Sequence, residues 1–254
     1  MSKKIANAKG LYLEGIRDGN MNAALDAYIG DRYTQHSTGV ADGKAGFIAF
    51  FEPFLARNPV RDIRILRAIE DGQYVFCHAH QSLNHGAQQW VTADLFDTDT
   101  RDRIIEHWDV IEAFGAKTPS GHTTVDGPTD VEDLPATEAN KERVRGFVDE
   151  VLRGGHIEAA AGYLSESYRE HSPRRADGLA GFRQAQVDDA TEYVEVHRLL
   201  GQGNLVVAYS HVRAGGDDHA QFDLFRLAEA EIVEHWDVRE TIGPQATWNN
   251  SGKF

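Results

Sequence analysis

A seven-residue segment that occurs twice is the feature that most constrains the fold of this chain. Residues Ile104–Val110 read Ile-Ile-Glu-His-Trp-Asp-Val, and residues Ile232–Val238 read Ile-Val-Glu-His-Trp-Asp-Val. A segment that holds His, Trp and Asp together does not recur by chance at this fidelity, so the chain consists of two copies of one unit. Each copy would hold about 127 residues, which is close to the commonest domain size and enough for its own hydrophobic core.

The repeated segment is predicted to be a β-strand, because branched apolar residues flank its polar centre on both sides. Successive side chains of a strand point to opposite faces. His107 and Asp109 therefore share one face, while Glu106 and Trp108 share the other. Each copy thus presents an imidazole and a carboxylate side by side, with a large indole behind them.

The rest of the first copy reads as helices followed by strands. Apolar residues at helical spacing predict helices over residues 3–18, 22–28 and 42–58, the last ending before Pro59. A short extended piece, residues 33–37, lies between the second and third helices. The period then changes to that of strands over residues 63–69, 74–83, 90–97 and 103–113. Helices followed by an antiparallel meander predict an α+β unit.

The second half repeats these elements. The matching positions around the short extended piece are Tyr33, His36, Ser37, Asp42, Gly43, Gly46 and Phe47 in the first copy, and Tyr168, His171, Ser172, Asp177, Gly178, Gly181 and Phe182 in the second. We place the first domain at residues 1–117 and the second at 138–254. Residues 118–137, rich in Pro, Gly, Thr and Asp, are expected to be a linker and a C-terminal arm. Residues 249–254 resemble the start of the same arm.

Composition excludes several classes of function. The chain has 41% hydrophobic and 26% charged residues, as soluble globular proteins do. Its net charge of −14, without a Lys/Arg stripe, argues against nucleic acid and anionic membranes as partners. No apolar run is long enough to span a bilayer, and no signal peptide is apparent. The single cysteine, Cys77, is expected to be a buried strand thiol and favours a cytoplasmic location.

The polar residues shared by both copies are the candidate site. They are His36, His80, Asp94, His107 and Asp109 in the first copy, and His171, His211, Asp223, His235 and Asp237 in the second. Asp94 and Asp223 each precede Leu-Phe, and an apolar pocket would raise the pKa of such a carboxylate and make it a useful acid or base. The structural alternative is a His–Asp pair that locks the strands, with Trp108 and Trp236 in the core. Both interpretations remain open.

The Asp-Leu-Phe strand at Asp94, the hairpin after it, the Glu-His-Trp-Asp segment and His36 upstream resemble the SnoaL-like polyketide cyclase family. This family belongs to the nuclear-transport-factor-2-like superfold, and the resemblance covers both halves. It implies two tandem cone-shaped α+β barrels, each a curved antiparallel sheet wrapped by N-terminal helices around an apolar pocket. Single-unit members are typically homodimers that pair through their sheets. We therefore expect an intrachain pseudo-dimer paired sheet to sheet, which leaves a monomeric state open.

The same resemblance implies a function. The family's cyclases close polyketide rings by aldol condensation without a cofactor or metal, with an aspartate and a histidine as acid and base. These roles carry over to Asp109 with His107 or Asp94, and to Asp237 with His235 or Asp223. The residues expected to contact a ligand are His36, His80, Trp108, His171, His211 and Trp236. We thus expect a cofactor-independent cyclase or isomerase acting on a small, largely apolar carbonyl compound. Each unit should hold a pocket, with Phe47, Phe51 and Phe54 in the first wall and Phe182 in the second.

Two other functions fit the same residues. One is a non-catalytic pocket that binds a small apolar ligand, because a fold alone does not give a function. The other is a zinc or iron site made from His36, His80, His107 and Asp94, which are suitable ligand types, although no metal-binding motif is shared by both halves. The two copies also differ in a loop, residues 84–87 against 215–218. The second unit could therefore have another substrate or serve only as a scaffold.

Overall fold

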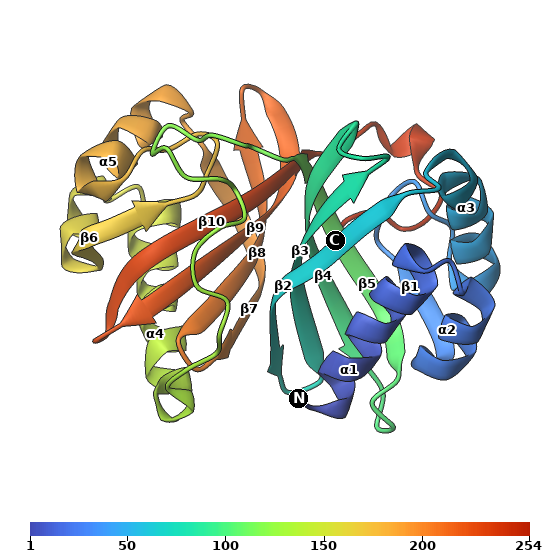
Figure 1. Cartoon of the computed structure of the whole chain (residues 1–254). Helices are drawn as coiled ribbons and strands as arrows, with labels where there is room; N and C mark the ends of the chain where they lie inside the picture. The colour runs from blue at the N-terminus through green and yellow to red at the C-terminus, as the bar shows by residue number, and fades with distance from the viewer. The chain divides into compact units, whose positions relative to one another are not determined.

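The computed structural model describes all 254 residues of the chain, which divides into two units. Unit 1 comprises Met1–Ala113 together with Gly243–Phe254, and unit 2 comprises Phe114–Ile242. Each unit has helices followed by a five-stranded sheet (Figure 1). The predicted tandem α+β architecture is therefore confirmed. No helix has the length and hydrophobicity needed to cross a lipid bilayer.

The helices of unit 1 begin where the apolar spacing predicted them. They are α1 (Lys3–Gly10), the π-helix η1 (Leu11–Arg17), α2 (Met21–Tyr28) and α3 (Gly43–Arg57). The side chain of Ser2 caps α1 by accepting a hydrogen bond from the backbone N–H of Ile5. Leu11, Tyr12 and Phe47 from these helices are buried in one core with residues of the sheet. The helices thus cover the face of the sheet on which His107 and Asp109 lie.

The sheet of unit 1 is mixed. Its strands are β1 (Ile29–Gln35), β2 (Arg61–Asp71), β3 (Tyr74–Leu83), β4 (Gln88–Thr98) and β5 (Ile104–Ala113), in the order β1-β5-β4-β3-β2. Strands β2 to β5 form the predicted antiparallel meander. The short extended piece forms the end of β1, which pairs with β5 in parallel. The expected sheet was wholly antiparallel, and β1 departs from it because the long connection through α3 and the meander lets β1 run alongside β5 in the same direction.

Unit 2 has the same topology. Its helices are α4 (Thr137–Phe147), η3 (Val148–Arg153), η4 (Ile157–Gly162) and α5 (Gly178–Asp188), preceded by the short 3₁₀ turn η2 (Leu134–Ala136). A further short 3₁₀ turn, η5 (Gln245–Thr247), belongs to unit 1. Its strands are β6 (Leu164–Glu170), β7 (Glu192–Gln202), β8 (Leu205–Ala214), β9 (Asp217–Ala228) and β10 (Glu231–Thr241), in the order β6-β10-β9-β8-β7. Strand β6 pairs with β10 in parallel, as β1 does with β5.

The shared Asp-Gly motif fixes the end of the first strand in each unit. The Asp42 carboxylate accepts a hydrogen bond from the backbone N–H of Gln35 at 2.7 Å, and Asp177 accepts the same bond from Glu170 at 2.7 Å. Gly46 follows in α3, where a Cβ would come within 2.0 Å of a backbone oxygen. Residues 35 and 170 thus end their edge strands opposite His107 and His235.

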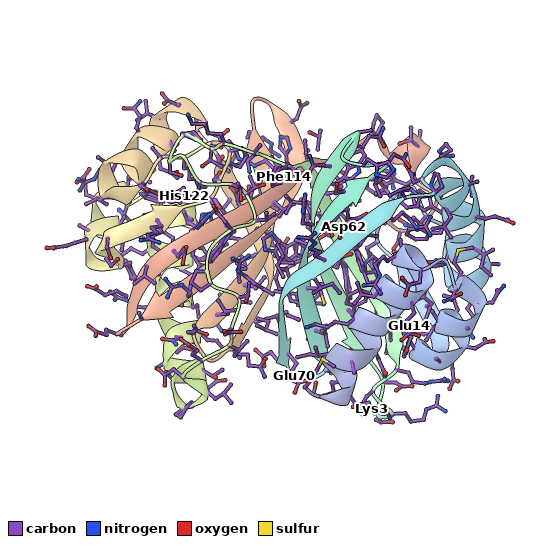
Figure 2. The ribbon with its side chains drawn as sticks, in the orientation of Figure 1. Lys3, Glu14, Asp62, Glu70, Phe114 and His122 are labelled. Carbon is purple, nitrogen blue, oxygen red and sulfur yellow. The ribbon has the colours of Figure 1, made fainter.

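The segments that follow the two sheets are exchanged between the units. The C-terminal arm, residues 243–254, belongs to unit 1, and the first arm, residues 114–127, belongs to unit 2. In Figure 1 the C-terminal segment, in red, reaches the part of unit 1 near α3, while the green segment after β5 runs along β10. His122 of the first arm, labelled in Figure 2, pairs with Asp177 at 3.3 Å. The stretch expected to be linker and arm thus lies wholly in unit 2.

Candidate functional site

Unit 1 contains a cavity of about 650 Å³ between its helices and its sheet. The apolar part of the wall includes Leu11, Ile16, Phe47, Phe51, Phe54 and Phe96. The three phenylalanines predicted from α3 are therefore confirmed in the wall. The buried polar part of the wall includes Tyr33, Gln35, Asp94, His107 and Asp109. The cavity is mostly apolar, with a small cluster of polar groups, as ligand sites usually are.

Asp94 and His107 form a hydrogen-bonded pair in this wall. His107 Nε2 lies 3.0 Å from Asp94 Oδ1, and His107 Nδ1 lies 2.9 Å from Gln35 Oε1. The backbone N–H of Ser37 also donates to Gln35 Oε1, so this atom is an acceptor and His107 donates from Nδ1. The second nitrogen, Nε2, is thus the one that exchanges a proton with Asp94.

The protonation of Asp94 is shifted toward the range useful for acid–base chemistry. Burial raises the pKa of this carboxyl, and the hydrogen bond and charge of His107 oppose that rise without cancelling it. The neighbouring Asp109 carboxylate raises the pKa further, while a hydrogen bond from Thr92 lowers it. A raised pKa makes a carboxylate a stronger proton acceptor.

Asp109 lies directly opposite Asp94 on the neighbouring strand and has a different partner. Lys253 Nζ of the C-terminal arm donates to Asp109 Oδ1 at 3.0 Å and to its backbone oxygen at 2.9 Å. Burial raises the pKa of Asp109, but the charges of Lys253 and His107 and hydrogen bonds from Lys253 and Ser37 outweigh it, so the pKa is lowered. Asp109 is therefore the more acidic of the two facing carboxyls.

Tyr33 supplies a hydroxyl group to the same wall. Its oxygen accepts a hydrogen bond from Gln35 Nε2 at 3.3 Å, which leaves its own proton to donate to a bound molecule. Burial and the Asp109 and Asp94 carboxylates raise the pKa of Tyr33 well above its ordinary value, so the hydroxyl stays protonated. Tyr33 was absent from the predicted site residues. Its retention as Tyr168 in the second copy was the signal that could have identified it.

Unit 2 brings the corresponding residues together in a closed, buried cluster. His235 lies between Glu170 Oε1 at 2.7 Å and Asp223 Oδ1 at 3.0 Å, and all three side chains are buried. Burial lowers the pKa of His235, but the charge of Glu170 and the hydrogen bonds that His235 donates to both carboxylates raise it to about 9. Tyr168 donates its hydroxyl proton to Glu170 Oε2 at 2.8 Å. The histidine is thus a fixed cation, and the tyrosine proton is already used.

Arginine side chains occupy the corresponding part of unit 2. Arg175, which matches Val40 of the unit 1 cavity wall, is only 3% exposed. Its guanidinium carbon lies 6.0 Å from the centre of the Phe182 ring, and its nearest nitrogen lies 4.0 Å from Glu170 Oε2. A hollow of about 260 Å³ on unit 2 touches neither Asp223, His235 nor Phe182. Where a second apolar pocket was predicted, the structure has a buried charge network of Glu170, Arg175, Asp223 and His235.

His36 and His171, predicted to contact a ligand, instead hold the arms. His36 stacks on Trp108 with ring centres 4.6 Å apart, donates from Nδ1 to the backbone oxygen of Gly252 at 2.7 Å, and pairs through Nε2 with Glu106 at 2.8 Å. Neither His36 nor Trp108 lines the cavity. His171 in unit 2 repeats this arrangement with Trp236, Thr123 and Glu234.

His80 and His211 lie elsewhere on their strands. His80 Nε2 is 3.1 Å from Gln89 Oε1, and His211 Nε2 is 2.8 Å from Asp218 Oδ1. His80 does not line the cavity. His36, His80, His107 and Asp94 are not brought together as a group of metal ligands. The structure thus joins Asp94, His107 and Asp109 in one site and leaves the other predicted residues of the first copy outside it.

Comparison with known proteins places this site in a familiar domain type. Residues 11–107 match the model of the SnoaL-like domain, and no curated protein matches the chain. Among solved structures, a candidate ketosteroid isomerase from Kribbella flavida is 23% identical, with 43% of this chain and 84% of that chain covered and a TM-score of 0.38. The candidate polyketide cyclase IdmH from Streptomyces antibioticus is 15% identical, with 44% and 93% covered and a TM-score of 0.38.

A further solved structure is an NTF2-like protein of unknown function from Cytophaga hutchinsonii, which is 20% identical, with 45% of this chain and 95% of that chain covered and a TM-score of 0.37. Each of these matches covers less than half of this chain. Residues 11–107 of the first unit are thus a SnoaL-like domain, and the second unit repeats the same helix-plus-five-strand architecture.

Proposed function

We propose that unit 1 is a cofactor-independent acid–base enzyme of the aldol cyclase or isomerase type, acting on a small, largely apolar carbonyl compound. The observation that carries the proposal is the buried Asp94–His107 pair in the wall of the 650 Å³ apolar cavity. A mostly apolar cavity of this size fits a small molecule, and a carboxyl with a raised pKa inside it suits proton transfer.

The proposed reaction begins at a carbon next to the carbonyl group of the substrate. Its C–H bond breaks, the proton passes to the Asp94–His107 pair, and the electron pair forms an enolate. Tyr33 donates its hydroxyl hydrogen bond to the enolate oxygen, where negative charge develops. In an isomerisation the pair returns the proton to another carbon. In an aldol closure the enolate carbon attacks a second carbonyl carbon, and the pair protonates the resulting alkoxide.

Asp109 serves this proposal as a fixed negative charge, in place of the proton shuttle expected from the sequence. Its carboxylate is bound to Lys253 at 3.0 Å, and its pKa is lowered. For unit 2 we propose a scaffold role. His235 is held as a cation between Glu170 and Asp223, so it has no free nitrogen with which to accept a proton.

The alternative is a protein that binds a small apolar molecule and does not transform it. The observation that favours this function is that both oxygens of Asp94 already have hydrogen-bond partners, Thr92 at 2.9 Å and His107 at 3.0 Å. Such a carboxylate could be a structural part of the wall.

Deuterium exchange separates the two functions. A molecule that co-purifies with the full chain is identified by mass spectrometry and then incubated with the protein in heavy water. Deuterium uptake at the carbon next to its carbonyl supports the enzyme. Tight binding without uptake supports the binding protein.

The location of the protein, its ligand class and its oligomeric state also stay proposals. We propose a cytoplasmic protein, which fits the single cysteine, since Cys77 is a free buried thiol on β3 as predicted. We keep the proposal of a small-molecule ligand. Sheet-to-sheet pairing of the two units as a pseudo-dimer, and a monomeric state in solution, also stay predictions, which light scattering and an experimental structure would test.

A further inference from the structure

Each unit holds two aspartates directly opposite each other on neighbouring strands. Asp94 pairs in register with Asp109, and Asp223 pairs in register with Asp237. All four side chains are buried. Two carboxyls at such a separation in an apolar interior are not both ionised without a cation, because like charges repel strongly there. Something in each unit must therefore decide which carboxyl of the pair carries the charge.

In unit 1 the cation comes from the penultimate residue of the chain. Lys253 is 2% exposed, and its Nζ contacts the Asp109 carboxylate and backbone oxygen. The arm that carries it is fixed by several hydrogen bonds. Asn249 N donates to Thr38 O at 2.9 Å, and the Gly252 oxygen accepts from His36 at 2.7 Å. Lys253 is therefore held at Asp109 by the fold of the arm.

In unit 2 the cation comes from a different place. Arg174 donates to Asp237 Oδ1 at 2.8 Å, and it lies in the loop after β6 that corresponds to residues 36–40 of unit 1. The arm of unit 2 follows the same path, since the Thr123 oxygen accepts from His171 as the Gly252 oxygen does from His36. The next residue there is Thr124, not lysine. The two units thus neutralise the same carboxylate from two independent positions.

We propose that Lys253 is a positioning residue that fixes Asp109 as the ionised member of its pair and leaves Asp94 as the member that exchanges a proton with His107. Lys253 does not line the cavity, so it acts through Asp109 and does not touch the ligand. The catalytic meaning of this assignment rests on the proposed acid–base function, which it deepens by naming the carboxyl that carries the proton. It also gives the C-terminal arm a defined role in the site of unit 1.

Four other titratable groups face the two carboxyls, but none of them supplies the cation that contacts Asp109. They are Tyr12 from η1, Tyr33 from β1, Cys77 from β3 and His107 from β5. Burial and the nearby carboxylates raise the pKa of both tyrosines and of the thiol, so these three groups stay neutral. His107 contacts Asp94. Lys253 is thus the cation in contact with Asp109.

The direct test follows the carboxyl carbons of the full chain by ¹³C NMR as pH is varied, without any ligand. D94N and D109N assign the two signals. In the wild type Asp109 should titrate below Asp94. In K253M the Asp109 midpoint should rise by about one pH unit or more, and the Asp94 midpoint should fall as its neighbour becomes neutral. K253R should restore the wild-type order. R174M, which removes the corresponding cation of unit 2, should leave both signals unchanged.

A double-mutant cycle tests the proposal even if the K253M variant folds poorly. If Lys253 acts through Asp109, K253M should be much less destabilising in the D109N background than in the wild type, as measured by urea unfolding. Equal destabilisation in both backgrounds, a D109N/K253M chain that does not fold, or unchanged titration in folded K253M would overturn the proposal. Confirmed titration shifts together with an active D94N would instead sink the proposed reaction and leave the charge assignment standing.

Discussion

At the scale of single residues, two positions separate the open site of unit 1 from the closed one of unit 2: Gln35 and Val40 in unit 1 stand against Glu170 and Arg175 in unit 2. Gln35 bonds to both His107 and Tyr33 without charge, whereas Glu170 at the same position fixes His235 as a cation and takes the proton of Tyr168. The two copies differ at these positions, so the residues that they have in common cannot reveal them. The local sequence therefore identified Asp94 and His107 but not what makes their site usable.

Placing the residue of unit 2 at position 35 of unit 1 tests the role of Gln35. Gln35→Glu should favour the imidazolium form of His107, because it places a carboxylate beside Nδ1 as Glu170 lies beside His235, and should divert the Tyr33 hydrogen bond to the new carboxylate. Activity at neutral pH should fall by roughly 10²-fold, the low end of the effect of losing a general base. A ¹⁵N NMR titration of the imidazole checks the cause. An unchanged His107 titration would contradict the role given to Gln35.

His235 predicts a dependence of stability on pH. Its folded-state pKa of about 9 exceeds its ordinary value of 6.5, so its contribution is fully present below pH 6.5 and is lost as pH rises through about 9. The loss should be about 3 kcal/mol, given the size of the shift. Urea unfolding between pH 6 and pH 10 measures it. His235→Gln should flatten this part of the profile, and a profile equally steep in that variant would exclude His235 as the source.

At the scale of elements, the sequence predicted most of the helices and strands. It did not predict with which neighbours each of them pairs or packs. The meander from β2 to β5 follows from alternating apolar residues, which fix strand, face and order together. The parallel pairing of β1 and the exchange of the arms depend on contacts between segments far apart in the chain. Local periodicity carries no information on such contacts, so residues 249–254 could be recognised as an arm but not assigned to unit 1.

The stability of the C-terminal arm should be unusually sensitive to substitution of Gly252. This residue has φ +101°, and a Cβ there would come within 2.2 Å of the Trp248 ring. Gly252→Ala should therefore destabilise the arm by more than about 1 kcal/mol. Gly121→Ala is the matched control, since Gly121 in the first arm also has positive φ but open space around it. Hydrogen exchange at the Asn249 amide reports on the arm. Equal effects of the two variants would rule out the steric explanation.

At the scale of the whole molecule, the chain holds one open site and one closed copy. The closed copy should be reopened by restoring the residues of unit 1 at two positions. Arg175→Val alone should cost about 3–5 kcal/mol, because it leaves Glu170 with fewer positive partners in the interior. The double variant E170Q/R175V should cost less and should bind a second ligand molecule per chain. Calorimetry measures the stoichiometry, and a double variant that is no more stable than R175V alone would argue against the charge network as the cause.

The central claim is that the Asp94–His107 pair of unit 1 moves a proton next to a carbonyl group. The most direct measurement is deuterium uptake from heavy water into the molecule that occupies the cavity, followed by NMR for the wild type, D94N and D223N. The account predicts uptake in the wild type, a fall of roughly 10²–10⁴-fold in D94N, and no fall in D223N. Wild-type uptake that persists in D94N, or that is lost in D223N alone, would contradict it.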